Sequence, residues 1–198
     1  HYGGALMNSL EQRLNKVEAV IAQPAFRQNK GLGNEVGYYI FDYPAEQELH
    51  VRECIEYIRK KSENSTNEFR VIVFDLYDII IDILKEKGYL DKCFEFEKSK
   101  GFDKITKSIG NMLRISATDS LIVNYIKDNA PPNSIVFLTG VGKCYPILRS
   151  HKVLNNLHQV IDNVPVVMFY PGKYDGQELV LFSEIKDDNY YRAFKLVD

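Results

Sequence analysis

A glycine-rich turn with a lysine follows an apolar run in the C-terminal half of the chain. Residues 135–138 are Ile-Val-Phe-Leu, and residues 140–143 are Gly-Val-Gly-Lys. The phosphate-binding loops of ATPases also join a strand to a helix, but they require Gly-x4-Gly-Lys followed by Ser or Thr. Phe137 stands where the first glycine is needed, and Cys144 stands where the hydroxyl that holds magnesium is needed. ATP hydrolysis at this turn is therefore not expected.

Two acids follow another apolar run, Val-Ile-Val-Phe at residues 71–74. In ATPases with a phosphate-binding loop, an acid at the end of such a strand helps to hold magnesium. Asp75 and Asp78 also suit the amino end of the helix that follows, where carboxylates accept hydrogen bonds from free amide groups. Because a complete phosphate loop is missing, the capping interpretation is favoured.

The histidines and cysteines do not form a recognisable reactive group. His151 and His158 are seven residues apart in one predicted helix, which separates them by about 10 Å along the axis. One zinc ion, with bonds of about 2 Å, cannot bind both, so we interpret them as structural histidines. Cys144 lies between a strand and a helix, where a thiol can be activated, but no base is near it in sequence. A buried or inert thiol is expected, with no cofactor or metal.

Two groups of polar residues could meet a partner. Lys143, Arg149, His151 and Lys152 form a small basic group that would suit an acidic partner or a phosphate, although ordinary surface charge is the simpler interpretation. Residues 187–194, Asp-Asp-Asn-Tyr-Tyr-Arg-Ala-Phe, contain the tyrosine and arginine types that binding hot spots favour. Such residues also pack the last element of a domain onto its core. Both interpretations of this segment stay open.

Bulk properties favour one cytoplasmic domain. The chain has 198 residues, of which 45% are hydrophobic and 26% are charged, as in an ordinary globular domain. The net charge of −2 recruits neither nucleic acid nor an anionic membrane. The three cysteines are far apart, which favours a reducing compartment, and no apolar run reaches the ~20 residues of a membrane span. Residues 1–6, His-Tyr-Gly-Gly-Ala-Leu before Met7, are interpreted as an expression remnant, and residues 7–198 as a single α/β domain.

Hydrophobic periodicity predicts helices that alternate with strands. Helices are expected at residues 9–21, 45–61, 79–88 and 146–161, with at least two more between 89 and 130 that break near Gly101. Strands are expected at residues 36–44, 69–78, 135–140, 164–172 and 178–182. This alternation predicts a mostly parallel sheet with helices on both faces, similar to a P-loop-type or Rossmann-like core without a functional phosphate loop. Ligands and partners of such sheets meet the carboxyl ends of the strands, which are expected at residues 42–44, 75–78 and 139–145.

Several longer segments resemble one protein family. They are FLTGVGKCYPILRSHKVLNNL, VPVVMFYPGKYDGQELVLF and DDNYYRAF, together with LEQRLNKVE and YYIFDYP near the N-terminus. These segments resemble BrxB, a small component of bacteriophage exclusion (BREX) defence systems. The resemblance implies an antiviral protein encoded beside a DNA methyltransferase, a large ATPase and PglZ, which is an alkaline-phosphatase-like protein. It carries no catalytic residues over to this chain, and it suggests an adaptor with PglZ as partner.

The sequence therefore predicts a non-enzymatic adaptor of a BREX-type complex. The alternative is a nucleotide- or nucleic-acid-responsive regulatory module that uses the strand-end loops with Asp75 and Lys143. A phosphodiesterase or nuclease would need a cluster of metal-binding carboxylates, which the sequence alone does not assemble. The candidate partner-binding residues are Gly140, Gly142, Lys143, Arg149, His151, Asn155, Asn156, Asp187, Asp188, Asn189, Tyr190 and Arg192.

Overall fold

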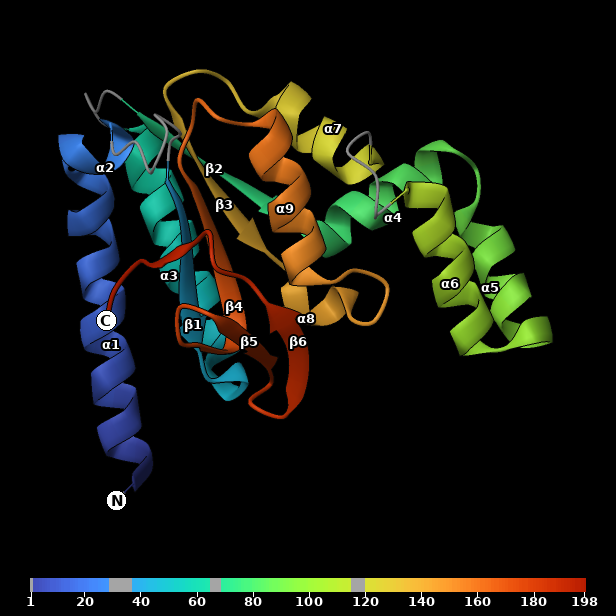
Figure 1. Ribbon diagram of the computed structural model, residues 1–198, viewed down its shortest axis with the longest axis horizontal. Coiled ribbons are helices and arrows are strands. Elements are labelled where there is room, and N and C mark those ends of the chain that lie inside the picture. Colours follow the sequence, from blue (N-terminus) through green and yellow to red (C-terminus); the bar gives the residue numbers. More distant parts are fainter. Residues whose placement is uncertain (1, 29–36, 65–68, 115–119) are drawn as a thin grey trace.

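A twisted sheet of five parallel strands forms the centre of the molecule. The computed structural model describes residues 2–28, 37–64, 69–114 and 120–198 (Figure 1). All the strand pairs in this part of the sheet are parallel. In spatial order the strands are β2 (Arg70–Asp75), β3 (Ser134–Thr139), β4 (Val166–Tyr174), β1 (Tyr38–Tyr43) and β7 (Phe194–Lys195). Every residue of β3 is buried, as two-sided cover of a parallel sheet requires.

An antiparallel extension grows from the second half of β4. Its strands are β5 (Glu178–Leu181) and β6 (Ile185–Asn189), which pair in the order β4, β5, β6. Gly172 allows β5 to approach β4, because a Cβ atom at this position would lie 2.1 Å from the main-chain oxygen of Val180. The predicted mostly parallel sheet is confirmed, and this extension is its antiparallel part.

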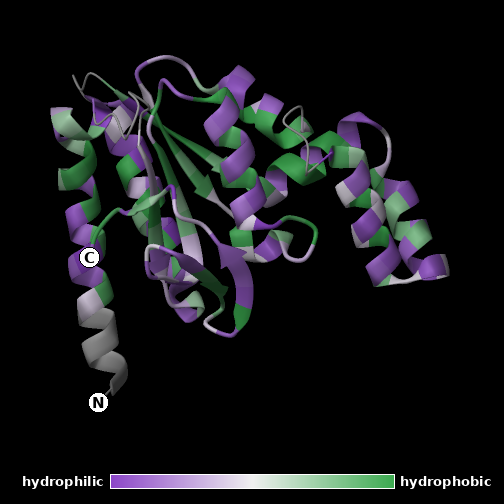
Figure 2. Ribbon diagram, viewed as in Figure 1, coloured by the Kyte–Doolittle hydropathy of each residue, from purple (hydrophilic) through white to green (hydrophobic). Residues whose placement is uncertain are grey.

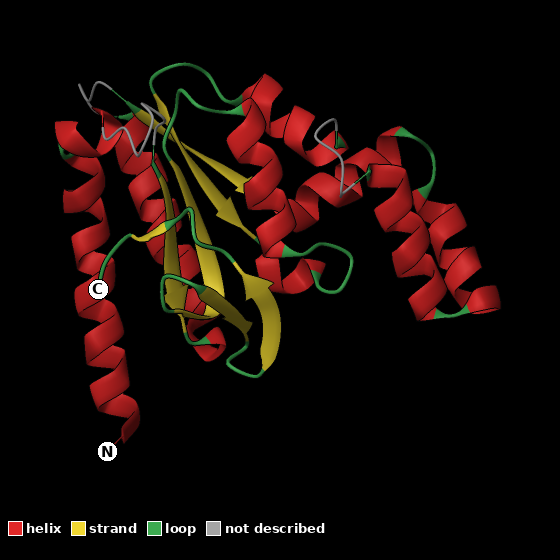
Figure 3. Cartoon of the chain, in the orientation of Figure 1, coloured by secondary structure: helices red, strands yellow, loops and turns green. Residues whose placement is uncertain are grey.

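Helices cover both faces of the parallel sheet (Figures 1 and 3). One face packs against α1 (Tyr2–Ala22), α2 (Pro24–Gln28) and α3 (Glu48–Glu63), which follows the short 3-10 helix η1 (Ala45–Gln47). The other face packs against α4 (Leu76–Glu86), α7 (Leu121–Asn129), α8 (Val141–Cys144) and α9 (Ser150–Val160), and α6 (Phe102–Leu113) extends this core beyond the sheet. Neighbouring strand residues alternate between the two cores, as the pleat requires: Phe137 belongs to one and Leu138 to the other. β2 and β3 are correspondingly mostly green in Figure 2, whereas β6 of the antiparallel extension is mostly purple.

A pair of helices projects from one end of the sheet (Figure 1). It consists of α5 (Leu90–Lys100) and α6, which are joined at Gly101 with φ at 92°. The break predicted near Gly101 is confirmed, because this backbone conformation favours glycine. No residue of α5 is fully buried, so this helix adds little to the core.

Two predicted boundaries are wrong by several residues. The strand predicted to run to residue 78 ends at Asp75, because the Asp75 side chain caps α4 and starts that helix at Leu76. The helix predicted from residue 146 begins at Ser150, because the preceding Arg149 is extended, with φ at −104° and ψ at 130°. Residues 141–144 instead form the short helix α8. At the N-terminus, α1 already begins at Tyr2, within the residues interpreted as an expression remnant.

Candidate functional site

The carboxyl ends of β1 and β2 are joined by a network of polar side chains. Asp75 Oδ1 accepts a hydrogen bond of 3.1 Å from the Asp78 amide, which confirms the capping interpretation. Its other oxygen lies 3.5 Å from Arg52 Nη2. Arg52 Nε donates to Glu48 at 2.9 Å, and Glu48 also accepts from the Tyr43 hydroxyl. Both oxygens of Asp75 are therefore engaged within the protein.

Sequence reasoning missed most of this network. The spacing of Glu48 and Arg52 by four residues on one helix was the available signal, since such pairs face each other. Their connection to Tyr43 and Asp75 depends on the parallel sheet, which places the carboxyl ends of β1 and β2 on the same side. Burial, followed by the hydrogen bond to Glu48, raises the pKa of Tyr43. The Tyr43 hydroxyl is thus a neutral donor at physiological pH.

The glycine-lysine turn is tight and covered. Gly140 has φ at 76°, and a Cβ atom there would lie 2.3 Å from Asp75 Oδ1, so the turn lies directly against the capping carboxylate. Phe182 lies over Gly142, where a Cβ atom would lie 2.9 Å from its ring. Lys143 Nζ lies 5.7 Å from the centre of the Tyr77 ring. A small cavity of about 270 Å³ remains here, between Glu48, Lys143 and Phe182.

Cys144 ends this turn as a buried thiol, as predicted. Only 1% of the residue is exposed. Burial, with a further contribution from the charge of Asp75, raises the pKa of its thiol to about 12. Because the thiolate is the nucleophile, Cys144 is unreactive at physiological pH.

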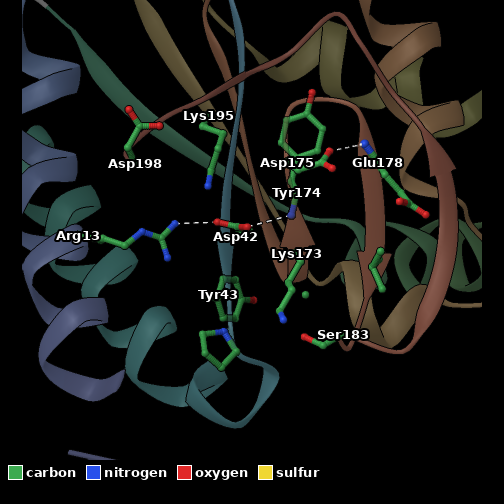
Figure 4. A pocket seen from close by; sticks show the side chains of 13 residues that line it. Arg13, Asp42, Tyr43, Lys173, Tyr174, Asp175, Glu178, Ser183, Lys195 and Asp198 are labelled. Atoms are coloured by element: carbon green, nitrogen blue, oxygen red, sulfur yellow. Dashed lines mark hydrogen bonds and ion pairs between the residues drawn. The ribbon is translucent and has the colours of Figure 1, made fainter. Parts of the chain in front are cut away.

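Asp42 lies in a separate and larger cavity. Its carboxylate pairs with Arg13 Nη2 at 2.7 Å and accepts a hydrogen bond of 2.9 Å from the Tyr174 amide (Figure 4). This cavity has a volume of about 620 Å³. The three strand-end positions singled out from the sequence therefore do not form one pocket: Asp75 and Lys143 flank the covered turn, and Asp42 belongs to the neighbouring cavity.

The two predicted partner-binding segments contact each other. Arg149 Nε donates to Asp187 Oδ1 at 2.6 Å, and the Tyr170 hydroxyl donates to the other oxygen of Asp187 at 3.2 Å. His151 Nδ1 forms a hydrogen bond of 3.0 Å with the main-chain oxygen of Asp187, and its Nε2 lies 3.6 Å from Asp188 Oδ2. The start of α9 and the strand β6 are thus joined into one face. Asp187 is its buried anchor, with 2% of its side chain exposed.

Comparisons with known proteins agree with the resemblance. The family model described as BREX protein BrxB matches residues 72–196, which include the glycine-lysine turn, α9 and β6. A protein of Bacillus cereus (strain H3081.97) named BREX protein BrxB is 53% identical over 192 residues, which cover 97% of this chain and 100% of the relative. One of Escherichia coli O9:H4 (strain HS) with the same name is 35% identical over 188 residues, 95% of this chain and 92% of the relative.

The chain belongs to the BrxB family. Membership links it to a phage-defence system of the BREX type, with other BREX components as its partners. No solved structure matches the chain. In the described residues, no helix combines the length and the apolar character that crossing a membrane requires.

The candidate partner-binding residues of this BrxB-family chain divide by burial. Asn156, Asp187 and Tyr190 are buried, as is Gly140, and they support the fold from within. Gly142, Arg149 and His151 are half-buried. The candidates that reach solvent are Lys143, Asn155, Asp188, Asn189 and Arg192.

Tyr190 and Tyr191 have opposite roles. Tyr190 is 2% exposed, and its main-chain oxygen accepts a hydrogen bond from Tyr174, whereas 66% of Tyr191 is exposed. The sequence did not indicate that the two tyrosines differ, and Tyr190 alone was named as a candidate. The exposed aromatic side chain of this face is Tyr191, which the sequence did not select.

His158 confirms the structural interpretation. Its ring stacks on that of Tyr38 with 3.6 Å between the ring centroids. Burial, and then the charge of Arg192, lowers the pKa of His158 to about 4. Within the described parts of the chain, no group of three or more histidine, cysteine or acidic side chains is arranged to hold a metal ion.

Proposed function

We propose that this chain is a non-enzymatic adaptor of a BREX-type complex, and that its partner is a PglZ-like protein of the alkaline-phosphatase superfamily. Family membership supports the defence role. The observation that carries the adaptor proposal is the engagement of the strand-end side chains with one another. Asp75 caps a helix and pairs with Arg52, and Cys144 is buried as a neutral thiol. These groups hold the loops in place, and none of them is poised as a nucleophile or a base.

The proposed docking surface is the α9–β6 face, defined by Asn155, Asp188, Asn189, Tyr191 and Arg192. All five residues are exposed. Tyrosine and arginine anchor many protein interfaces, and here they lie beside an amide and a carboxylate that can fix orientation. The Arg149–Asp187 pair beneath the face holds β6 against α9 before any partner arrives. A surface ordered in this way loses little entropy on binding.

Co-purification from cells that carry the other BREX components tests this proposal. Tyr191→Ala removes the aromatic anchor, and Asn155→Arg adds a bulky charge to the same face. Each variant is expected to weaken recovery of the PglZ-like protein at least about tenfold and to leave the urea unfolding curve unchanged. Tyr57→Ala is the matched control, because Tyr57 is 60% exposed on α3 at the opposite side of the sheet. Full recovery with both face variants would rule out this surface.

Charge reversal of Arg149 does not test the interface cleanly. Arg149→Glu would place a second carboxylate against Asp187, which is 1% exposed. A buried charge that loses its partner destabilises the fold. If that variant lost association, local unfolding of the face and loss of a direct contact would explain the result equally well.

The nucleotide-responsive alternative has little support at the glycine-lysine turn. Phe182 covers Gly142, and the carboxylate of Asp75 is engaged with Arg52 and the α4 amide. Neither side chain is arranged to meet a phosphate or its magnesium ion there.

A further inference from the structure

The projecting hairpin of α5 and α6 leaves a large aromatic side chain in solvent. α5 is the outer helix of the hairpin in Figure 1, and none of its residues is fully buried. Leu90, Cys93 and Phe96 pack half-buried against the core, whereas 56% of Phe94 is exposed. A single exposed aromatic residue is ordinary in a folded protein, so its neighbours decide whether it belongs to an interface.

Two charges of opposite sign lie on the same side of α5 as Phe94. Asp91 precedes Phe94 by three residues and Lys98 follows it by four, and residues at these spacings share one side of a helix. Both side chains are exposed, and among the described residues neither forms an ion pair or a hydrogen bond. The two charges also suit the dipole of α5, but the dipole does not account for the ring between them. We call these three residues the α5 row.

The α5 row is complementary to a second copy of itself. Along the helix axis, Asp91 lies about 4.5 Å before Phe94 and Lys98 about 6 Å after it. If two α5 helices pack antiparallel about a two-fold axis, the second row runs in the opposite direction. The two Phe94 rings then meet at the centre, and each Asp91 lies opposite the Lys98 of the other copy. One contact therefore covers both rings and forms two ion pairs.

The other charged side chains of α5 do not oppose this arrangement. Glu97 would lie opposite Leu90 of the second copy, and Glu95 faces sideways, about 100° round the helix from Phe94. Lys100 and Lys92 lie still further round, by about 120° and 160°. Like charges therefore do not face each other across the centre of the contact.

The place of α5 in the fold leaves the row accessible. α5 packs against α6 and α4 and projects with α6 from one end of the sheet (Figure 1). A second copy can therefore reach the row without displacing a helix from the sheet. None of the three residues belongs to the α9–β6 face, so a contact here leaves that face free.

We propose that the chain forms a two-fold dimer through the α5 row, with the Phe94 rings in contact and two reciprocal Asp91–Lys98 ion pairs. The contact is small, so a weak dimer with a dissociation constant of about 10–100 μM is expected. The dimer presents two α9–β6 faces and can hold two partner molecules in one assembly. Dimerisation and the adaptor function use different residues, so either can fail without the other.

Sedimentation equilibrium of the full chain at low salt, up to about 500 μM protein, tests the dimer. Phe94→Ala removes the ring, and Asp91→Lys or Lys98→Glu places like charges against each other at both ends of the contact. Each variant is expected to weaken dimerisation at least about tenfold. Lys100→Glu is the matched control, because it reverses a charge in the same last turn of α5 but away from the row. All four residues are exposed, so the variants keep their fold, which circular dichroism verifies.

A mixture of the two charge variants separates a lost contact from a damaged fold. When an Asp91→Lys chain pairs with a Lys98→Glu chain, opposite charges meet at both ends of the contact. The equimolar mixture is therefore expected to recover the dimer that each variant lacks alone. Damage to the hairpin would not be repaired by mixing.

Three results would overturn the proposal. The first is the absence of a dimer of the unaltered chain up to about 500 μM. The second is a dimer that Phe94→Ala retains in full or that Lys100→Glu removes, because it would lie elsewhere on the chain. The third is a mixture of the two charge variants that dimerises no better than either variant alone.

Discussion

Asp187 is the single side chain on which the α9–β6 face depends most. It is buried, and both of its carboxylate oxygens are paired, one with Arg149 and one with Tyr170. The pair is asymmetric, because 34% of the Arg149 side chain is exposed but only 2% of the Asp187 side chain. Removing the arginine therefore leaves the buried carboxylate of Asp187 without its cationic partner. The attraction between the two side chains is itself moderate, because solvent reaches Arg149 and screens its charge.

Arg149→Ala is expected to lower the free energy of unfolding by about 2 kcal/mol, measured by urea denaturation. Adding Asp187→Asn should restore part of that loss, because a neutral amide costs less to bury than a carboxylate. Lys186→Ala is the control on the same strand, where the exposed pair with Glu178 should contribute less than about 0.5 kcal/mol. If Arg149→Ala and Lys186→Ala lowered the free energy of unfolding equally, the buried pair would contribute no more than the exposed one, which contradicts this account.

His158 makes stability depend on pH below neutrality. The folded protein takes up a proton on His158 only near pH 4, whereas an unfolded chain does so near its ordinary value of about 6.5. Between these values the unfolded chain binds more protons, so falling pH favours unfolding. His158→Phe keeps a ring against Tyr38 but cannot titrate. Between pH 6.5 and about 4, the free energy of unfolding of His158→Phe should fall less steeply than that of the unaltered chain, and the two slopes should differ by up to about 1.4 kcal/mol per pH unit. Parallel pH profiles for the two proteins would contradict the role assigned to His158.

Sequence reasoning at this scale succeeded where the partner is local. Asp75 was predicted to cap a helix that starts beside it, and its side chain bonds to the amide three residues on. It failed where the partner is distant, because Arg149 and Asp187 are 38 residues apart. Nothing in the local pattern indicated that these two residues, assigned to separate candidate segments, would neutralise each other.

At the scale of elements, the turn from β3 into α8 depends on glycine for two reasons. Gly140 has a positive φ, and the place of its missing Cβ atom is filled by the Asp75 carboxylate. Gly88 offers a comparison with a similar φ of 71° and nothing within 4 Å of a Cβ atom. Substitutions at the two glycines therefore distinguish the cost of backbone strain, present at both, from the cost of steric overlap, present at Gly140 alone.

Gly88→Ala is expected to cost about 1–2 kcal/mol of stability from the left-handed backbone alone. Gly140→Ala should exceed this by at least about 1 kcal/mol, because the new methyl group displaces the carboxylate that caps α4. Thermal and urea unfolding of the two variants measure the difference. If Gly140→Ala costs no more than Gly88→Ala, the close approach to Asp75 does not constrain the turn.

The order of the elements could be predicted from the sequence, but their spatial arrangement could not. Apolar runs and helical spacing predicted β1 to β5 and most of the helices, because these patterns are local. That β4 lies between β3 and β1 depends on contacts between residues far apart in sequence. The late start of α9 was missed because the apolar periodicity continues through Ile147 and Leu148, although residues 145–149 are not helical.

At the scale of the whole molecule, the α9–β6 face and the cavity beside Asp42 are different surfaces, because no residue that defines the face lines the cavity. The α9–β6 face carries the proposed partner contacts, and the cavity lies at the carboxyl ends of β1 and β4. The larger cavity could not be located from the sequence, because its wall combines α1, β1, the β4–β5 hairpin and the end of the chain. Of its residues, only Asp42, Tyr43 and Pro44 were singled out from the sequence, as the carboxyl end of a predicted strand.

Direct titration of the purified chain with a purified PglZ-like partner tests the adaptor proposal most directly. The proposal predicts a saturable complex with a dissociation constant of about 1 μM or tighter, weakened by Tyr191→Ala and unaffected by Tyr57→Ala. The absence of any complex at micromolar concentrations of both proteins would contradict it.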